Sequence, residues 1–163
     1  MKMYVLQVRH GYEFSVCQEL GKHGFDAVLP TRQEFIRRGG TWSIYEKIIF
    51  TQYVFLKFEV TEESYYRIKK IDGVVRLLGF ENGVLQPLNR AEQSYIEWLW
   101  NDGKPVEPSK IYVTPSGDKM IMSGILRKYS GDEIEYNLRQ RKANIFVEIA
   151  GHRHKVTLPV VRI

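Results

Sequence analysis

With 163 residues, 44% of them hydrophobic and 13% aromatic, the chain can form one domain or two small ones, which excludes global disorder. No apolar run approaches the roughly 20 residues that span a bilayer, so we expect a soluble, cytoplasmic protein without membrane partners. The single cysteine, Cys17, excludes an internal disulfide and a zinc site built from several cysteines.

The net charge of +5 comes entirely from the second part of the chain. Residues 1–103 contain 13 Lys and Arg against 13 Asp and Glu, whereas residues 104–163 contain 11 against 6. A basic excess attracts polyphosphate without regard to its sequence. We therefore expect two units with different electrostatics, and nucleic acid is a candidate ligand of the second.

Hydrophobic periodicity predicts the first elements. Alternation over Met3–Arg9 predicts a strand, helical spacing over Tyr12–Lys22 predicts a helix, and Phe25–Leu29 reads as a short strand that ends at Pro30.

A hairpin follows. The segments Glu34–Arg38 and Thr41–Tyr45 flank Gly39 and Gly40, a pair that supplies the positive φ angles of a tight turn. The sequence therefore predicts a basic, protruding hairpin.

The most apolar stretch of the chain is Glu46–Val60. From Tyr53 onward, bulky residues alternate on both faces of an extended backbone, which favours a strand in the middle of a sheet. We expect one of its faces to be packed by helices and the other to be covered by an apolar surface, which need not belong to this chain.

Residues 61–101 predict two more helices around one strand. Thr61 is a candidate N-cap for a helix that ends at Asp72. Val74–Phe80 is predicted as a strand, and Asn89–Asn101 as a helix with an apolar stripe. With the preceding elements, this order predicts an α+β fold, a ferredoxin-like sandwich with an inserted β-hairpin.

Residues 104–112 read as a linker between a first domain, 1–103, and a second, 113–163, because Gly103, Pro105 and Pro108 discourage regular structure there. Short strands separated by glycines follow and predict a small all-β barrel. The strand candidates are Lys119–Met122, Gly124–Tyr129, Ile134–Leu138, Ala143–Ile149 and His154–Leu158.

Taken together, the ordered segments resemble the NusG family of transcription elongation factors over nearly the full chain. In the first domain, which resembles the family's NGN domain, the resemblance is carried by Met3–Gln7, Val28–Pro30, Arg37–Gly40, Phe50–Phe55 and Asp72–Gly79. In the second, which resembles a KOW module, it is carried by Gly131, Ile134, Arg141–Ala143, Val147, Gly151 and Val156–Leu158.

Three residues at two places depart from the family pattern. Met3 stands where tryptophan is usual, and Thr51-Gln52 stands where Pro-Gly is usual. With the charge of the second domain, these differences resemble a specialised branch of the family, such as the LoaP proteins.

The resemblance implies a bacterial factor, a monomer without cofactor, that suppresses pausing and termination. Its first domain would bind the clamp helices of the largest RNA polymerase subunit through an apolar depression, a helix-in-groove contact. By position, the residues that would line the depression are Tyr4, Phe50, Tyr53 and Phe55.

Basic residues suggest nucleic-acid contacts, although a solvated charged face explains them as well. The candidates for upstream or non-template DNA are Arg9, His10, Lys22, Arg37 and Arg38. For an RNA hairpin in the nascent leader transcript they are Arg127, Lys128, Arg139, Arg141, Lys142, Arg153 and Lys155. The resemblance also implies ribosomal protein S10 or a termination factor as partners of the second domain.

Catalysis is not expected. His152 and His154 share a strand face, but no third metal ligand stands near them, and Cys17 has no nucleophile signature. An alternative to the polymerase factor is a ribosome-associated RNA-binding or RNA-chaperone protein, whose first domain would dimerise through its aromatic face.

Overall fold

The computed structural model describes residues 1–129, 131 and 133–163, and the chain divides into two compact units. Unit 1 comprises Met1–Pro30, Phe50–Gly103 and Glu148–His152, and unit 2 comprises Thr31–Ile49, Lys104–Val147 and Arg153–Ile163. Each unit is therefore built from segments that are distant in the sequence.

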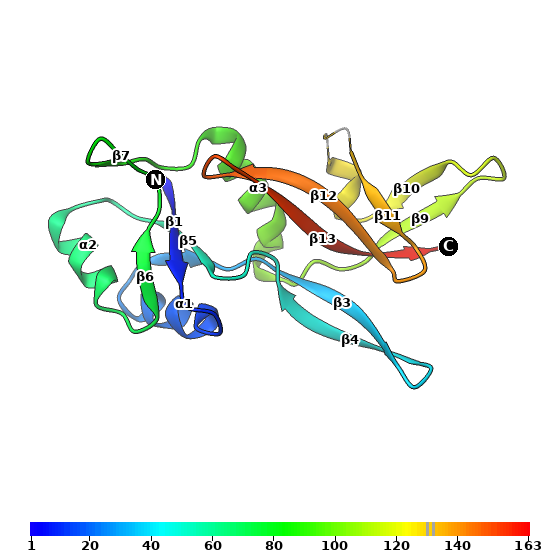
Figure 1. The fold of residues 1–163 in the computed structure, drawn as a ribbon, viewed down its shortest axis with the longest axis horizontal. Helices are drawn as coiled ribbons and strands as arrows, with labels where there is room; N and C mark the ends of the chain where they lie inside the picture. Colours follow the sequence, from blue (N-terminus) through cyan, green and yellow to red (C-terminus); the bar gives the residue numbers. More distant parts are fainter. Residues whose placement is uncertain (130, 132) are drawn as a thin grey trace. The chain divides into compact units, whose positions relative to one another are not determined.

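Unit 1 contains a four-stranded sheet (Figure 1). Its strands are β1 (Met3–Val8), β2 (Asp26–Val28), β5 (Tyr53–Lys57) and β6 (Val74–Leu77), in the order β2-β5-β1-β6. Each neighbouring pair is antiparallel. The predicted α+β fold and the central place of β5 are confirmed, and the middle residues of β5, Val54, Phe55 and Leu56, are fully buried.

Three helices belong to unit 1, and two of them begin with a side-chain cap. Helix α1 (Glu13–Lys22) buries Val16 and Leu20. Helix α2 (Glu62–Lys69) is capped by Thr61, as predicted, and α3 (Arg90–Trp100) is capped by Asn89. In each of these two, the third helical residue bonds back to the cap, which satisfies backbone groups that the helix leaves unpaired. The unit also contains a short hairpin, β7 (Phe80–Glu81) and β8 (Val84–Leu85), and a 3-10 turn, η1 (Asn101–Gly103).

The predicted hairpin is present as β3 (Thr31–Arg38) and β4 (Thr41–Ile48), with eight residue pairs in register from Thr31↔Ile48 to Arg38↔Thr41. Gly39 and Gly40 have φ angles of 57° and 79°. Both lie in the left-handed region that glycine adopts without strain, which explains why the strands turn there.

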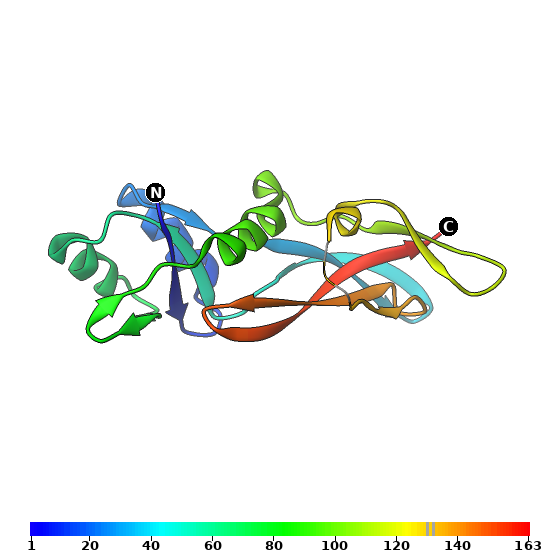
Figure 2. The ribbon, with the colours of Figure 1, turned by 90° about the horizontal axis from the view of Figure 1, so that it is seen from above.

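The second sheet of the chain contains five strands. They are β9 (Ser109–Val113), β10 (Lys119–Ser123), β11 (Glu135–Asn137), β12 (Lys142–Ile149) and β13 (His152–Arg162), in the order β10-β9-β13-β12-β11. Strands β12 and β13 run side by side in both views (Figures 1 and 2). The prediction of a closed barrel is wrong, because among the described residues β10 and β11 each pair on one side only and form open edges.

A second correction concerns residues 124–129, which were predicted as a strand. They form a 3-10 turn, η2 (Ile125–Lys128), instead. Gly124 has a φ of 101°, which interrupts the extended backbone, and the Leu126 amide donates to the buried hydroxyl of Ser109 at 3.3 Å. The side chain of Leu126 is fully buried. The apolar residues that suggested a strand therefore anchor a turn.

The segment predicted as a linker, 104–112, contains ordered contacts of unit 2. The Val106 amide donates to the Thr31 carbonyl, its carbonyl accepts from the Gln33 amide, both at 2.9 Å, and its side chain is buried. Strand β9 begins at Ser109. The β3–β4 hairpin thus groups with the second part of the chain.

This grouping separates the charges more sharply than the sequence alone did. Counted over the unit ranges, unit 2 has 15 Lys and Arg against 7 Asp and Glu, a net charge of +8. Unit 1 has 9 against 12, a net charge of −3. A polyanion is therefore attracted by one unit and repelled by the other.

Candidate functional site

The turn that holds Phe50 and Tyr53 is tied to two other elements of unit 1. The Tyr53 amide donates to the Phe50 carbonyl at 3.3 Å, and the Gln52 carbonyl accepts from the Val8 amide of β1 at 2.8 Å. The Gln52 amide donates to Oε2 of Glu13 in α1 at 3.2 Å. Gln52 has a φ of 68°, where glycine is favoured, so these bonds hold a backbone conformation that glutamine rarely adopts.

Glu13 is a residue of this site that the sequence analysis did not identify. It lies in the first turn of α1, only 2% of its surface is exposed, and its Oε1 has no hydrogen-bond partner among the described residues. A carboxyl group there faces the positive end of the helix dipole. The only sequence signal was an acidic residue at a helix start, since its partner Gln52 stands 39 positions away.

The four aromatic residues assigned to polymerase contact differ in exposure. Phe50, Phe55 and Tyr4 are buried, with exposed fractions of 4%, 0% and 7%. Phe50 packs edge to face on Phe55, with 5.5 Å between the ring centroids. Tyr53 is half-buried at the start of β5. Tyr53 is thus the most exposed of the four side chains, and Phe50 and Phe55 lie in the interior.

The three DNA candidates of unit 1 do not form one cluster. Arg9 and His10 are exposed before α1, and the Arg9 guanidinium lies 6.0 Å from the Tyr12 ring centroid. Lys22 lies at the other end of α1, about 14 Å away along the helix axis. Its Nζ forms an ion pair with Oε1 of Glu19 at 3.1 Å.

The two DNA candidates of the hairpin are exposed at the end of β3, beside the glycine turn. Arg37 is paired with Trp42 of β4, and its guanidinium lies 5.9 Å from the indole centroid. Arg38 makes no ion pair or ring contact within the described part of the chain. Both charges are therefore accessible from solvent.

Four of the seven RNA candidates are engaged by other side chains of unit 2. Arg153 pairs with Glu133 at 3.0 Å and lies 4.1 Å from the Phe146 ring centroid. Lys155 pairs with Glu135 at 3.8 Å. Lys142 and Arg141 contact the β3–β4 hairpin.

The remaining RNA candidates, Arg127, Lys128 and Arg139, are exposed. Within the residues that the structure describes, none of the three makes an ion pair or a ring contact. Arg127 and Lys128 belong to η2, and Arg139 lies in the turn between β11 and β12. These charges are the most available to an anionic ligand.

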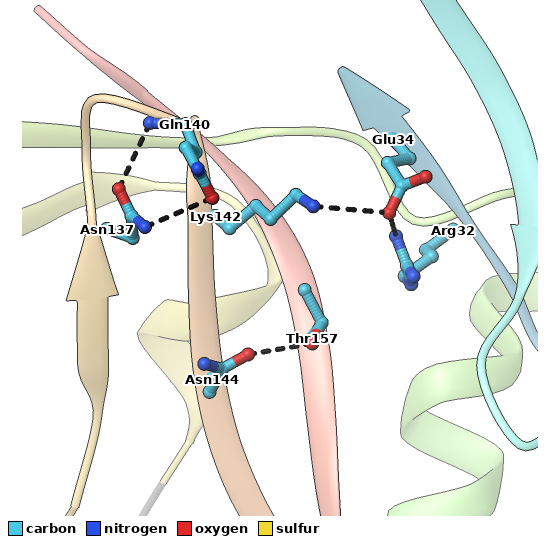
Figure 3. Close-up of polar contacts among 7 residues, drawn as sticks. All are labelled: Arg32, Glu34, Asn137, Gln140, Lys142, Asn144 and Thr157. Atoms are coloured by element: carbon cyan, nitrogen blue, oxygen red, sulfur yellow. Dashed lines mark hydrogen bonds and ion pairs between the residues drawn. The ribbon is translucent and has the colours of Figure 1, made fainter. Parts of the chain in front are cut away.

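Glu34 of the hairpin joins two cations (Figure 3). Its Oε1 lies 3.1 Å from Nη1 of Arg32 and 3.6 Å from Nζ of Lys142. Partial burial alone raises the pKa of Glu34, but the hydrogen bond from Arg32 and the charges of Arg32, Lys142 and Lys47 outweigh it, so the pKa lies below its usual value. The ionised form is thus the stable one in the folded chain.

The residues considered for metal binding and nucleophilic chemistry can be placed in the structure. The described residues contain no group of three or more His, Cys, Asp or Glu placed to hold a metal ion. Burial raises the pKa of the Cys17 thiol, which lowers the fraction of reactive thiolate. No helix in the part of the chain that the structure describes has the length and apolarity needed to cross a membrane.

Comparisons with known proteins point in one direction. A family model described as "Transcription termination factor nusG" matches residues 1–97. The transcription termination/antitermination proteins NusG of Neisseria meningitidis serogroup B and Bacillus subtilis are each 22% identical to this chain. The matches cover 96% of this chain and 93% of the Neisseria protein, and 98% of this chain and 96% of the Bacillus protein.

A solved structure described as "Domain interaction in Thermotoga maritima NusG" is similar in fold. The match covers 97% of this chain and 93% of the Thermotoga chain, with a TM-score of 0.60 and 22% sequence identity. The similarity therefore extends over both units in sequence and in fold class.

Proposed function

This chain belongs to the NusG family, a family of transcription proteins rather than enzymes, and on that premise we propose that it is a bacterial elongation and antitermination factor. Unit 1 would dock on the clamp helices of the largest RNA polymerase subunit. By bridging the polymerase there, it would disfavour the opening that accompanies pausing and termination, which is a shift of populations in the partner.

The observation that supports this proposal most is the fixed turn at Phe50–Tyr53. Hydrogen bonds to β1 and α1 hold it, and Phe50 packs on the buried Phe55. A partially exposed aromatic side chain on a rigid support loses little conformational freedom on binding, which is typical of residues that dominate interface energetics. Tyr53 is therefore the proposed anchor.

The basic unit would bind nucleic acid beside the polymerase. Its exposed cations suit the phosphates of an RNA hairpin in the nascent leader transcript, and those of the β3–β4 tip suit upstream or non-template DNA. Ribosomal protein S10 or a termination factor would be alternative partners of this unit. The protein would act as a cytoplasmic monomer of a specialised branch such as LoaP.

The docking proposal is tested by capture of purified bacterial RNA polymerase on the immobilised full-length protein. We expect Tyr53→Ala to weaken capture at least tenfold, because truncation of an interface anchor costs about 2 kcal/mol or more. A peptide with the sequence of the clamp helices should compete. Phe14→Ala is the matched control, since Phe14 is a 58% exposed aromatic residue of the same unit.

Equal capture by the wild type and Tyr53→Ala, or no competition by the peptide, would contradict docking through this turn. Absence of any capture, with retained RNA binding, would favour the RNA-chaperone alternative. In vitro transcription across an intrinsic terminator then measures the proposed effect directly. The wild type should increase read-through, and Tyr53→Ala should not.

A further inference from the structure

The β3–β4 hairpin and the turn between β11 and β12 contact each other in unit 2. The guanidinium of Arg141, in the turn, lies 4.3 Å from the ring centroid of Trp42 and 5.0 Å from that of Phe35. These two rings belong to the hairpin and meet edge to face at 6.2 Å. Residues separated by about a hundred positions therefore share one surface.

We propose that this shared surface, centred on Arg37, Trp42 and Arg141, is a single site for the phosphate backbone of a nucleic acid. The inference rests on the nucleic-acid part of the proposed function. It replaces two independent sites, one for DNA on the hairpin and one for RNA on the second domain, with one continuous site.

The backbone directs Arg141 toward the hairpin. Arg141 has a φ of 58°, its amide donates to the Leu138 carbonyl at 3.2 Å, and its carbonyl accepts from the Val160 amide at 3.1 Å. This backbone fixes the direction in which the side chain leaves the turn, and the contacts with Trp42 and Phe35 place its guanidinium at the hairpin. The neighbouring Lys142 reaches Glu34 of the hairpin and adds a second link.

Two positive charges lie close to one indole ring. Arg37 lies 5.9 Å and Arg141 4.3 Å from the Trp42 centroid, so their guanidinium carbons are no more than about 10 Å apart, which is close to the Debye length at physiological salt. The repulsion between the two charges is therefore only partly screened. An anion bound near both of them would reduce it.

The two segments that meet here contain few acidic residues. The hairpin, residues 31–49, and the turn, residues 138–142, together contain seven Lys and Arg and only two acidic residues. One of these, Glu34, already bonds Arg32 and pairs with Lys142. The local excess of positive charge thus remains for an external ligand.

The exposed residues around the pair suit a repeating polyanion. Arg38 and Arg139 are exposed, and neither makes an ion pair or ring contact in the described part of the chain. The planar fork of arginine binds phosphate oxygens in pairs, and successive phosphates would be met by successive arginines along the surface. A nucleic-acid backbone supplies this spacing of charge, whereas a single small anion would leave the outer arginines unused.

The test measures binding of one fluorescent RNA hairpin and one duplex DNA of equal length to the full chain by anisotropy, over a range of salt concentrations. The variants are Arg37→Gln in the hairpin, Arg139→Gln in the turn, and both together. Each residue is exposed, so the fold should be retained, and a thermal melt checks this. Lys70→Gln, an exposed cation of unit 1, is the matched control.

For a shared site, both single substitutions weaken the binding of the same probe three- to tenfold. Each also reduces the dependence of affinity on salt by about one counterion. The better-bound probe identifies the source of the phosphates. The inference is overturned if Arg37→Gln affects only the duplex while Arg139→Gln affects only the RNA, or if a polyglutamate peptide binds as tightly as either probe.

Capture of RNA polymerase by the same variants separates this inference from the proposed function. The double variant should still capture polymerase, because both arginines belong to unit 2. If the wild type captures none, docking fails while the anisotropy result still decides the shared site.

Discussion

The two units differ in how they present the residues proposed for binding. Unit 1 has a net charge of −3. Three of its four aromatic residues proposed for binding are buried, and the turn that holds two of the four is fixed by hydrogen bonds. In unit 2, with a net charge of +8, the cations lie on the surface, and about half of those predicted to bind are paired within the chain. An apolar contact needs a rigid shape, whereas a phosphate contact needs accessible charge.

The largest expected effect is a loss of stability confined to one unit, caused by replacing a closely packed glycine in that unit. In Gly73→Ala, the new Cβ would lie 2.5 Å from the Tyr12 ring, and in Gly124→Ala it would lie 2.6 Å from the Ser109 Cα, both at positive φ. We expect each change to destabilise its own unit by about 3 kcal/mol, combining a steric clash with backbone strain. Hydrogen exchange resolved by segment measures which unit opens.

Gly11→Ala and Gly117→Ala are the matched controls. These glycines also have positive φ, but an added Cβ meets nothing within 4 Å. Only strain of about 1 kcal/mol is expected there. Equal effects in test and control variants would contradict the role given to the close contacts.

A second prediction concerns the fixed turn of unit 1. Glu13→Ala removes the acceptor of the Gln52 amide and should destabilise unit 1 by about 2 kcal/mol, since a partly buried hydrogen bond to a carboxyl group is lost. Polymerase capture should fall as well, because Tyr53 loses its rigid support. Chemical denaturation and the capture assay measure the two effects.

Glu19→Gln is the control for this prediction. Glu19 is in the same helix but exposed, and it pairs only with Lys22 in the described part of the chain. Its change should leave stability within about 0.5 kcal/mol of the wild type. A loss of capture in this variant would show that helix charge, rather than the turn, controls docking.

A third prediction breaks the contact between the hairpin and the β11–β12 turn. Trp42→Ala removes the ring that Arg141 and Phe35 contact, and we expect unit 2 to lose about 1.5 kcal/mol from cation–π and aromatic packing. Hydrogen exchange of 31–49 should become faster. Tyr45→Ala, a more exposed aromatic substitution in β4, should leave that exchange almost unchanged.

The smallest effect concerns Glu34 and pH. Because the folded state lowers its pKa, Glu34 contributes stability above its unfolded pKa of about 4.3 and loses it as the pH falls through the folded value. Glu34→Gln should therefore destabilise unit 2 at pH 7 by about 1 kcal/mol, the scale of a partly exposed ion pair. Thermal melts at pH 7 and pH 3 should show a smaller difference at pH 3 than at pH 7.

Several elements followed from local sequence. Examples are the alternation in β1 and β5, the Thr61 cap of α2 and the glycine turn of the hairpin. Each depends on residues a few positions apart, so the local sequence was sufficient to predict it. The η2 turn was predicted as a strand, because its apolar residues fit that pattern. The hydrogen bond that the Leu126 amide donates to Ser109, 17 positions away, has no signal in the local sequence.

Composition and periodicity by themselves determined that this chain is an α+β protein with a neutral first part, a basic second part and a recognisable family pattern. The tertiary structure alone decided that the β3–β4 hairpin groups with the basic unit, that the second sheet is open, and that Glu13 holds the aromatic turn. The reason is physical. Charge and periodicity are local properties, whereas the contacts of Arg141 with Trp42 and of Glu13 with Gln52 join residues whose separation no local pattern encodes.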